Sequence, residues 1–329
     1  MLSMLKIFHL ISVILFTVIF SLKSAAQDKS YEEWYLKSKD SLDIYVRELG
    51  AGKDTVIVVH GGFGANHDYM LDAIKGLETQ YHFVLYDQRG STLSLAPIEK
   101  LTFPKNVEDL YLLITELKLE KAKIIYHSMG TLVGMEFLKL HPEKVSNLIL
   151  IGALPAKADT VEGSSIFSKR YETQVDSLMN RREVKDLKEY YESRNGSDSS
   201  QAGYYNYKSH LTDKEQTELW RIEFASVNIY RMANWRLMKG GRAYYKKDAA
   251  VMAESVNWVY DYRQALNDNG KVTIIMGDHD FLDFNAENHK KLLANFPKVK
   301  VVTIKDAGHN IWTDDPIKFK IELIKALTK

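Results

Sequence analysis

The chain contains no cysteine, so disulfides, thiolate metal sites and cysteine nucleophiles are excluded. It also has no surplus of charge of one sign: 44 Lys and Arg stand against 43 Asp and Glu. This balance gives no electrostatic reason to expect nucleic acid as a partner. No GxxxxGK[ST] loop and no HExxH motif occurs, and residues 66–67 break a GxGxxG pattern that begins at Gly62. We therefore expect neither a metal nor a bound cofactor.

The composition is otherwise that of an ordinary globular protein. Hydrophobic residues make up 45% and charged residues 26% of 329 positions, which excludes wholesale disorder and a polytopic membrane protein. A chain of this length buries a large core and has room for an inserted segment.

The N-terminus has the pattern of a secretory signal. Lys6 precedes an apolar run over residues 7–22, and small residues follow at 24–26. We predict a cleaved signal over residues 1–26 and export to the periplasm or the medium. A bacterial periplasm suits an exported protein that lacks disulfides. The alternative is a retained membrane anchor through residues 7–22, a run slightly shorter than the roughly 20 residues of a membrane span.

Short, continuous apolar runs alternate with segments of helical spacing. The runs lie at 56–59, 83–86, 123–126, 148–151, 272–276 and 299–304. Continuous runs indicate strands that are buried on both faces, and their alternation with helices indicates a mainly parallel sheet. The segment 155–250 is charged and rich in tyrosine, with no convincing buried strand. We predict an α/β fold with a core over residues 27–154 and 251–329 and a helical cap insertion over residues 155–250.

Three reactive side chains follow predicted strands, where the active sites of parallel sheets gather. Ser128, Asp280 and His309 occur in the chain order of an α/β-hydrolase triad. A serine hydroxyl needs a base to act as a nucleophile, and the base needs a carboxylate to fix its tautomer. We therefore predict Ser128 as nucleophile, His309 as base and Asp280 as acid. Asp278 and Asp283 are the alternatives for the acid.

The turns around these strands predict an oxyanion hole. The N–H of Met129, at the start of a helix, is one expected donor, and Gly62 is the other because a residue without Cβ lets a substrate carbonyl approach. We expect His60 to brace its loop and the turn after His127 to point that side chain away. Residues 87–90 are expected to form a structural turn with an internal ion pair.

Two segments resemble a known family. HGGFG at residues 60–64 with HDY at 67–69, and YDQRG at 86–90, are similar to the HGGPG and DQRG-like segments of the prolyl iminopeptidase branch of the α/β-hydrolase superfamily. The resemblance extends from about residue 40 to the end, except for much of the insertion. It implies a serine hydrolase that cleaves an N-terminal residue, often proline, from short peptides.

The resemblance also implies roles for residues of this chain. It places the nucleophile, acid and base on Ser128, Asp280 and His309, and the oxyanion donors on Gly62 and Met129. In that family, carboxylates of the cap hold the free amine of the substrate. The segment Arg221-Ile222-Glu223 looks like the motif that carries one of them, so Glu223 is a candidate for substrate binding. The alternative is that Glu223 lies on an exposed helix face.

The chain departs from the family pattern at three positions. Phe63 replaces the proline of HGGPG, Tyr126 replaces the glycine two residues before the nucleophile, and Thr131 replaces a small residue after Gly130. The ring of Tyr126 needs space, which we expect against the insertion or in the substrate pocket. Phe63 and Tyr126 are therefore candidates for substrate binding. A second amine-binding glutamate is not evident in the cap.

These patterns favour an exported serine hydrolase that works through an acyl-enzyme on a small-molecule or short-peptide substrate. An aminopeptidase of the prolyl iminopeptidase type is the leading hypothesis. One alternative is a carboxylic ester hydrolase of the same fold. Another is a catalytically silent binding protein, which the bulky Tyr126 beside the nucleophile motivates.

Overall fold

The structure is a computed structural model that describes residues 31–158, 162–195, 211–238 and 246–328. The candidate site belongs to the compact unit over Glu33–Lys329. The predicted signal at 1–26 and the alternative anchor at 7–22 lie outside the described residues. Among the helices that are described, none is both long and apolar enough to cross a membrane.

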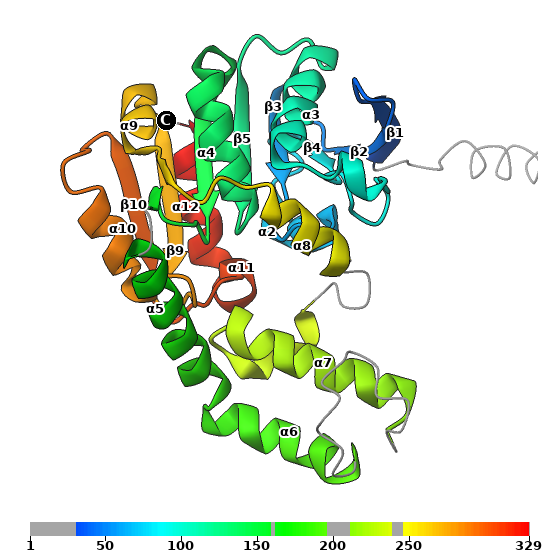
Figure 1. Ribbon diagram of the computed structural model, residues 1–329, viewed down its shortest axis with the longest axis vertical. Coiled ribbons are helices and arrows are strands. Elements are labelled where there is room, and N and C mark those ends of the chain that lie inside the picture. The colour runs from blue at the N-terminus through cyan, green and yellow to red at the C-terminus, as the bar shows by residue number, and fades with distance from the viewer. Residues whose placement is uncertain (1–30, 159–161, 196–210, 239–245, 329) are drawn as a thin grey trace, which may run out of the picture. The chain divides into compact units, whose positions relative to one another are not determined.

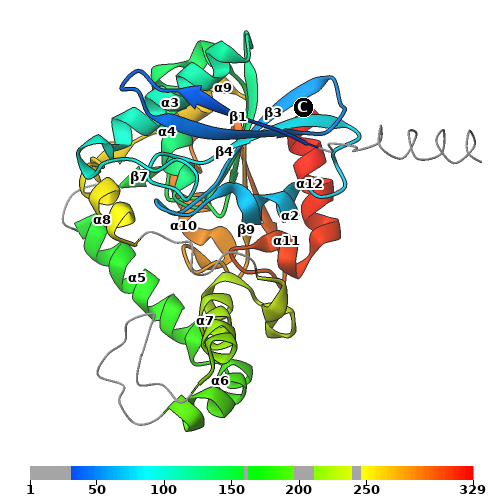
Figure 2. The same ribbon diagram turned by 90° about the vertical axis from the view of Figure 1, so that its right-hand side faces the viewer.

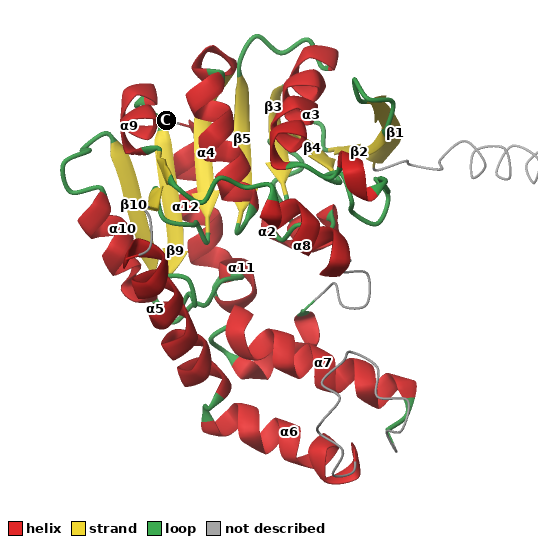
Figure 3. Cartoon of the chain, viewed as in Figure 1, coloured by secondary structure: helices red, strands yellow, loops and turns green. Residues whose placement is uncertain are grey.

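The centre of the molecule is an eight-stranded sheet in the order β1-β2-β4-β3-β5-β6-β9-β10 (Figure 3). Strand β2 pairs antiparallel with β4, and the pairs from β4 to β10 are parallel. The predicted α/β fold with a mainly parallel sheet is confirmed. The strands are β1 (Tyr31–Lys37), β2 (Asp43–Leu49), β3 (Asp54–Val59), β4 (Tyr81–Tyr86), β5 (Ala122–His127), β6 (Val145–Ile151), β9 (Val272–Gly277) and β10 (Val299–Ile304).

All six apolar runs form strands. Five of them lie inside the sheet, buried between two layers of helices, whereas β10 lies at an edge of the sheet and its residues 300–303 are only partly buried. In β3, for example, the four residues 56–59 are fully buried. The strands β1 and β2, at one end of the sheet, were not predicted. Strand β1 is largely exposed, and its charged and aromatic residues give no continuous apolar run.

Helices cover both faces of the sheet, as Figures 1 and 2 show. One core layer contains the apolar side chains of α3, α4, α8 and α9, and the other contains those of α2, α11 and α12. The helices of the core are α2 (Met70–Ile74), α3 (Phe103–Glu116), α4 (Gly130–Leu140), α8 (Lys246–Glu254), α9 (Arg263–Asn269), α10 (Glu287–Leu292), α11 (Ile311–Asp314) and α12 (Pro316–Thr328), with 3-10 turns η1 (His67–Tyr69), η2 (Ile98–Lys100), η3 (Pro142–Lys144) and η5 (Phe284–Ala286).

Between β6 and β9 the chain forms α5 (Glu162–Met179), α6 (Arg182–Asn195), α7 (Asp213–Asn228) and η4 (Met232–Leu237). The short strands β7 (Lys157–Ala158) and β8 (Tyr260–Asp261) flank this segment and pair antiparallel. Its side chains form a separate apolar cluster around Ile222 and Trp235. The expected boundary at residue 250 falls inside α8, whose Met252 packs in a core layer of the sheet.

Candidate active site

Ser128 lies directly after β5, in a sharp turn that leads into α4. Its φ is 52°, a left-handed conformation that costs a non-glycine residue on the order of 1–3 kcal/mol. The turn is held by the Ser128 N–H, which donates to the Ile151 carbonyl at 3.0 Å, and by the Thr131 hydroxyl, which donates to the Ser128 carbonyl at 2.6 Å. A strained strand-to-helix turn of this kind presents a serine at the top of a sheet.

Glycines let the turn pack closely against the end of β3. A Cβ added to Gly61 would lie 2.5 Å from the Cβ of Ser128, and one added to Gly130 would collide with the carbonyl of His60. Any side chain at Gly61 or Gly130 would therefore separate the two turns. The residues predicted for the nucleophile and for the oxyanion hole consequently come from adjoining turns.

His309 and Asp280 form a buried pair. The Nδ1 of His309 lies 3.0 Å and 2.9 Å from the two carboxylate oxygens of Asp280, and the two residues are 2% and 0% exposed. Nδ1–H donates to the carboxylate, which leaves Nε2 as the basic nitrogen. Two chain segments that are about 30 residues apart thus meet at one edge of the sheet.

The structure also distinguishes Asp280 from the two alternative candidates for the acid. The carboxylate of Asp278 pairs with His279 at 2.7 Å, and that of Asp283 pairs with His289 at 2.7 Å. Hydrogen bonds from His289 hold the pKa of Asp283 below its usual value against the effect of burial. Among the three predicted candidates, Asp280 is the one that contacts His309.

Gly152 joins the pair to the turn of Ser128, a role that the sequence pattern did not predict. A Cβ at Gly152 would lie 2.7 Å from ring atoms of His309 and 3.1 Å from Asp280 Oδ2. The residue before it, Ile151, accepts the N–H of Ser128. The available signal was a glycine directly after the apolar run 148–151. These contacts bring Ser128, His309 and Asp280 to the carboxyl ends of β5, β6 and β9.

The N–H groups of the two predicted oxyanion donors, Gly62 and Met129, have no hydrogen-bond partner among the described residues. Their neighbours are occupied, because Gly61 N–H donates to the Tyr69 hydroxyl and Ser128 N–H to Ile151. The N–H groups of Gly62 and Met129 therefore lie on the two adjoining turns, one on each, and are available to an oxyanion.

The expectation that His127 points away from the site is wrong. Its ring centroid lies 4.5 Å from that of His309, and it is 3% exposed. Successive residues of a strand face opposite sides. Tyr126 and His127 therefore occupy opposite faces of β5, and the segment from His309 to Trp312 crosses the face that carries His127. Burial and the neighbouring His309 hold the pKa of His127 well below its usual value.

His60 braces its loop, as expected. It is fully buried, its Nδ1 contacts the Gly61 carbonyl at 2.8 Å, and its Nε2 accepts the Gln88 N–H at 3.0 Å. Burial lowers the pKa of His60, which fits a neutral ring with a proton on Nδ1.

The turn at 87–90 is structural, but the internal ion pair predicted for it is wrong. Asp87 accepts from His67 Nδ1 at 2.7 Å, whereas Arg89 pairs with Asp109 at 2.8 Å and with Asp40 at 3.1 Å. Both partners of Arg89 are at least 20 positions away in the sequence, so local spacing does not reveal them.

The predicted locations of Tyr126 and its role as a substrate-binding residue are corrected by the structure. Tyr126 is fully buried in the core layer beneath α4 and faces neither the insertion nor an open pocket. Its space comes from Gly134, where a Cβ would lie 2.7 Å from the tyrosine ring. Phe63 is also nearly buried, at 4% exposed, and its ring packs edge-on against Phe103 at 6.4 Å.

Glu223 lies on a partly exposed face of α7. Its side chain is 45% exposed and pairs with Lys188 of α6 at 3.4 Å. The residue before it, Ile222, is buried in the cluster of the insertion. Glu223 thus forms a partly exposed ion pair on a helix face, and its role in substrate binding stays a prediction.

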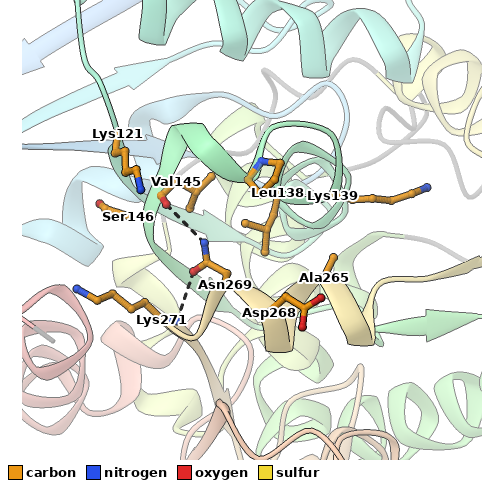
Figure 4. A pocket seen from close by; sticks show the side chains of 10 residues that line it. Lys121, Leu138, Lys139, Val145, Ser146, Ala265, Asp268, Asn269 and Lys271 are labelled. Atoms are coloured by element: carbon orange, nitrogen blue, oxygen red, sulfur yellow. Dashed lines mark hydrogen bonds between the residues drawn. The ribbon is translucent and has the colours of Figure 1, made fainter.

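A surface pocket of about 560 Å³ lies elsewhere, next to the amino ends of β5, β6 and β9 (Figure 4). Lys121, Val145 and Lys271 stand at or directly before those strand starts. The pocket is thus at the edge of the sheet opposite to Ser128 and does not belong to the candidate active site.

Comparison with known proteins identifies the family. A model of the alpha/beta hydrolase fold matches residues 54–316. The chain belongs to the alpha/beta hydrolase family. It is a hydrolase-fold enzyme, and the matched region contains Ser128, Asp280 and His309.

Individual relatives of this hydrolase have different names. A Haemophilus influenzae protein provisionally named an esterase/lipase is 23% identical over 82% of the chain and 81% of its own length. A Synechocystis protein provisionally named a non-heme chloroperoxidase is 31% identical over 35% of the chain, and the match spans only 42% of that relative. A proline iminopeptidase-related protein from Thermus thermophilus shares the fold, with a TM-score of 0.58, 18% identity, and coverage of 91% of this chain and 97% of that one.

Proposed function

We propose that this protein is an exported serine hydrolase that cleaves small carboxylic esters through an acyl-enzyme on Ser128. The observation that carries the proposal is the buried Asp280–His309 pair next to the strained turn of Ser128. A base oriented by a carboxylate and a serine at the top of the sheet are the parts that acyl transfer requires.

The chemistry follows from the positions of these groups. His309 Nε2 takes the proton of the Ser128 hydroxyl as the oxygen attacks the substrate carbonyl. Asp280 holds the Nδ1–H and stabilises the imidazolium that forms. The N–H groups of Gly62 and Met129 donate to the oxyanion. His309 then gives the proton to the leaving alcohol, and water repeats the sequence to release the acid.

No hydrogen bond joins the Ser128 hydroxyl to His309 among the described contacts. Catalytic hydrogen bonds of free enzymes are often long and shorten when substrate binds. We therefore expect the Ser128 to His309 contact to form in the complex with substrate.

The state of Glu223 favours an ester over a free-amine substrate, since its carboxylate already pairs with Lys188. The esterase/lipase name of the Haemophilus relative points the same way. An aminopeptidase remains the second candidate because HGGFG and YDQRG resemble prolyl iminopeptidases and because the Thermus structure shares the fold.

Parallel turnover of p-nitrophenyl esters and of prolyl and other aminoacyl anilides tests the proposal. We expect ester turnover and covalent labelling by a serine-reactive phosphonate, both lost in Ser128→Ala. Anilide turnover at a higher kcat/KM than ester turnover would establish the peptidase instead. Absence of labelling together with no turnover would leave the binding protein.

Export rests on the N-terminal sequence alone. We expect N-terminal sequencing of the protein from a bacterial host to begin near Gln27 and the protein to fractionate with the periplasm. A mature chain that begins at Met1 in the membrane fraction would favour the anchor instead.

A further inference from the structure

A series of one buried and two part-buried hydrogen bonds connects the turn of the oxyanion donors to the loop of the base. The Gly61 N–H donates to the Tyr69 hydroxyl. That hydroxyl lies 2.9 Å from His127 Nδ1, and His127 Nε2 lies 3.3 Å from the His309 carbonyl. The chain thus begins one residue before Gly62 and ends on His309 itself.

The number of protons gives this chain a single direction. The His309 carbonyl opposite Nε2 only accepts, so Nε2 carries a proton. Burial lowers the pKa of His127 and leaves the ring neutral, so Nδ1 carries no proton and accepts the hydrogen of the Tyr69 hydroxyl. The oxygen of that hydroxyl accepts from the Gly61 N–H. His127 is therefore present as the neutral Nε2–H tautomer.

We propose that His127 is a positioning residue of the reaction: as a neutral Nε2–H imidazole, it fixes the main chain of His309 relative to the turn that carries Gly62. The inference rests on the proposed serine hydrolase function. It goes beyond that function, because it assigns a role to a residue that acts through His309 and not on the substrate.

The surroundings of the ring support this role. His127 packs against His309 at 4.5 Å, Trp312 at 5.0 Å and Tyr69 at 5.4 Å. His309 becomes positive during the reaction, and a second cation at this distance would oppose that charge. The titratable or charged groups that act on His127 are His309 with its partner Asp280, His60, and Tyr69. No carboxylate among the described contacts pairs directly with His127, and the burial that lowers its pKa keeps it neutral.

Two substitutions at position 127 test the hydrogen bonds separately from the packing. His127→Phe keeps an aromatic ring but removes both bonds. His127→Gln offers an oxygen that accepts from Tyr69 and an N–H that donates to His309. We expect kcat for ester hydrolysis to fall on the order of 10²-fold in His127→Phe, with KM changed less than about twofold, and His127→Gln to recover most of the loss.

A matched pair of tyrosines tests the other end of the chain. Tyr69→Phe removes the hydroxyl that links Gly61 to His127. Tyr86→Phe removes a buried hydroxyl that has no hydrogen-bond partner among the described residues. We expect a loss of kcat for Tyr69→Phe and wild-type kcat for Tyr86→Phe, with both melting temperatures recorded by circular dichroism.

Imidazole ¹⁵N spectra provide a readout that does not depend on turnover. We expect the His127 resonances of the wild-type protein to report the Nε2–H tautomer without titration between pH 5.5 and 8. Tyr69→Phe should shift the Nδ1 resonance. An Nδ1–H tautomer or titration in this range would overturn the proposal. So would equal kcat values in His127→Phe and wild type, or a His127→Gln variant as slow as His127→Phe. A wild-type protein without turnover or labelling would refute the proposed function. The ¹⁵N spectra would still show whether the hydrogen bonds through His127 have the proposed direction.

Discussion

The carboxyl edge of the sheet and the helical insertion differ in how they treat charge. At the edge, Asp280, Asp283 and Asp87 are each at most 1% exposed, and each has a histidine partner. In the insertion, pairs such as Arg182–Asp186 are more than 60% exposed on both sides. Buried partners fix geometry, whereas exposed ion pairs add little free energy. The buried pairs at the carboxyl edge therefore hold side chains in fixed positions, as catalysis requires, whereas the exposed pairs of the insertion do not.

One buried carboxylate connects the two regions. Asp314 accepts the N–H of Gly308, beside the base, and the N–H groups of Tyr230 and Arg231, directly after α7. The Asn310 N–H adds a bond of 2.7 Å to the Asn228 carbonyl. The position of the insertion is thus tied to the loop of His309.

The largest effect is expected at the edge, from Ser128→Ala. The proposed reaction has no other nucleophile, so we expect ester kcat to fall on the order of 10⁶-fold and phosphonate labelling to disappear from intact-mass spectra. Ser146→Ala, in the pocket at the opposite edge of the sheet, is the matched control and should behave as wild type. Labelling that persists in Ser128→Ala would place the nucleophile elsewhere.

The next effect is expected from Asp280→Asn. The amide would hold the wrong tautomer of His309, and we expect kcat to fall on the order of 10⁴-fold with the fold retained. Asp283→Asn is the comparison. Because Asp283 pairs with His289 and not with His309, we expect this substitution to lower the melting temperature and to leave kcat nearly unchanged. Steady-state kinetics and thermal unfolding of the two variants check this. The reverse pattern would make Asp283 the acid.

Asp314→Ala breaks the connection between the two regions. Three N–H groups, one buried and two part-buried, lose their acceptor, each at a cost of up to about 1–3 kcal/mol unless water replaces it. We expect a loss of several kcal/mol in urea unfolding and a lower kcat. We also expect faster proteolysis within α5 to α7 than in wild type. A variant with wild-type stability and uniform protease resistance would show that the two regions are held together by other contacts.

Most strands of the sheet, and the placement of the three candidate residues directly after strands, were predictable because they depend on local pattern. Residues 56–59 and 272–276 are apolar runs, and Ser128, Asp280 and His309 follow strands in a known order. The choice of Asp280 over Asp278 and Asp283 was not fixed by spacing, since all three lie in one loop. Which of them meets His309 depends on the course of a loop about 30 residues later.

His127 and Tyr126 show more clearly what a sequence pattern does not predict. Their opposite faces follow from strand geometry, but what covers each face is a long-range property. Gly134 makes room for Tyr126, and the loop at 309–312 covers His127. The partners of Arg89 were missed for the same reason.

Mild acid should reduce stability first through the carboxyl edge of the sheet, where two buried histidines lie, and only at lower pH through the insertion. Burial holds the pKa values of His60 and His127 below the usual 6.5 of an unfolded chain. The unfolded state therefore binds more protons, and stability present above pH 6.5 is lost as the pH falls below it. We expect each histidine to contribute a slope of up to about 1.4 kcal/mol per pH unit between pH 6.5 and 5. Urea unfolding of wild type and His127→Gln across this range measures how much of the pH dependence of stability is due to His127. Identical slopes in the two proteins would contradict a contribution from His127.

The smallest effect is expected in the insertion, from Glu223→Ala. Its side chain is 45% exposed and paired with Lys188, which also pairs with Glu192 at 2.9 Å. Removing one of two exposed partners should change the free energy of unfolding by less than about 1 kcal/mol and leave ester kcat/KM unchanged. Glu192→Ala is the matched control, because it removes the other partner of the same lysine. We expect the two variants to give equal KM values for aminoacyl anilides. A KM that rises only in Glu223→Ala would assign this carboxylate to the substrate amine and make the insertion, together with the edge, part of a peptidase site.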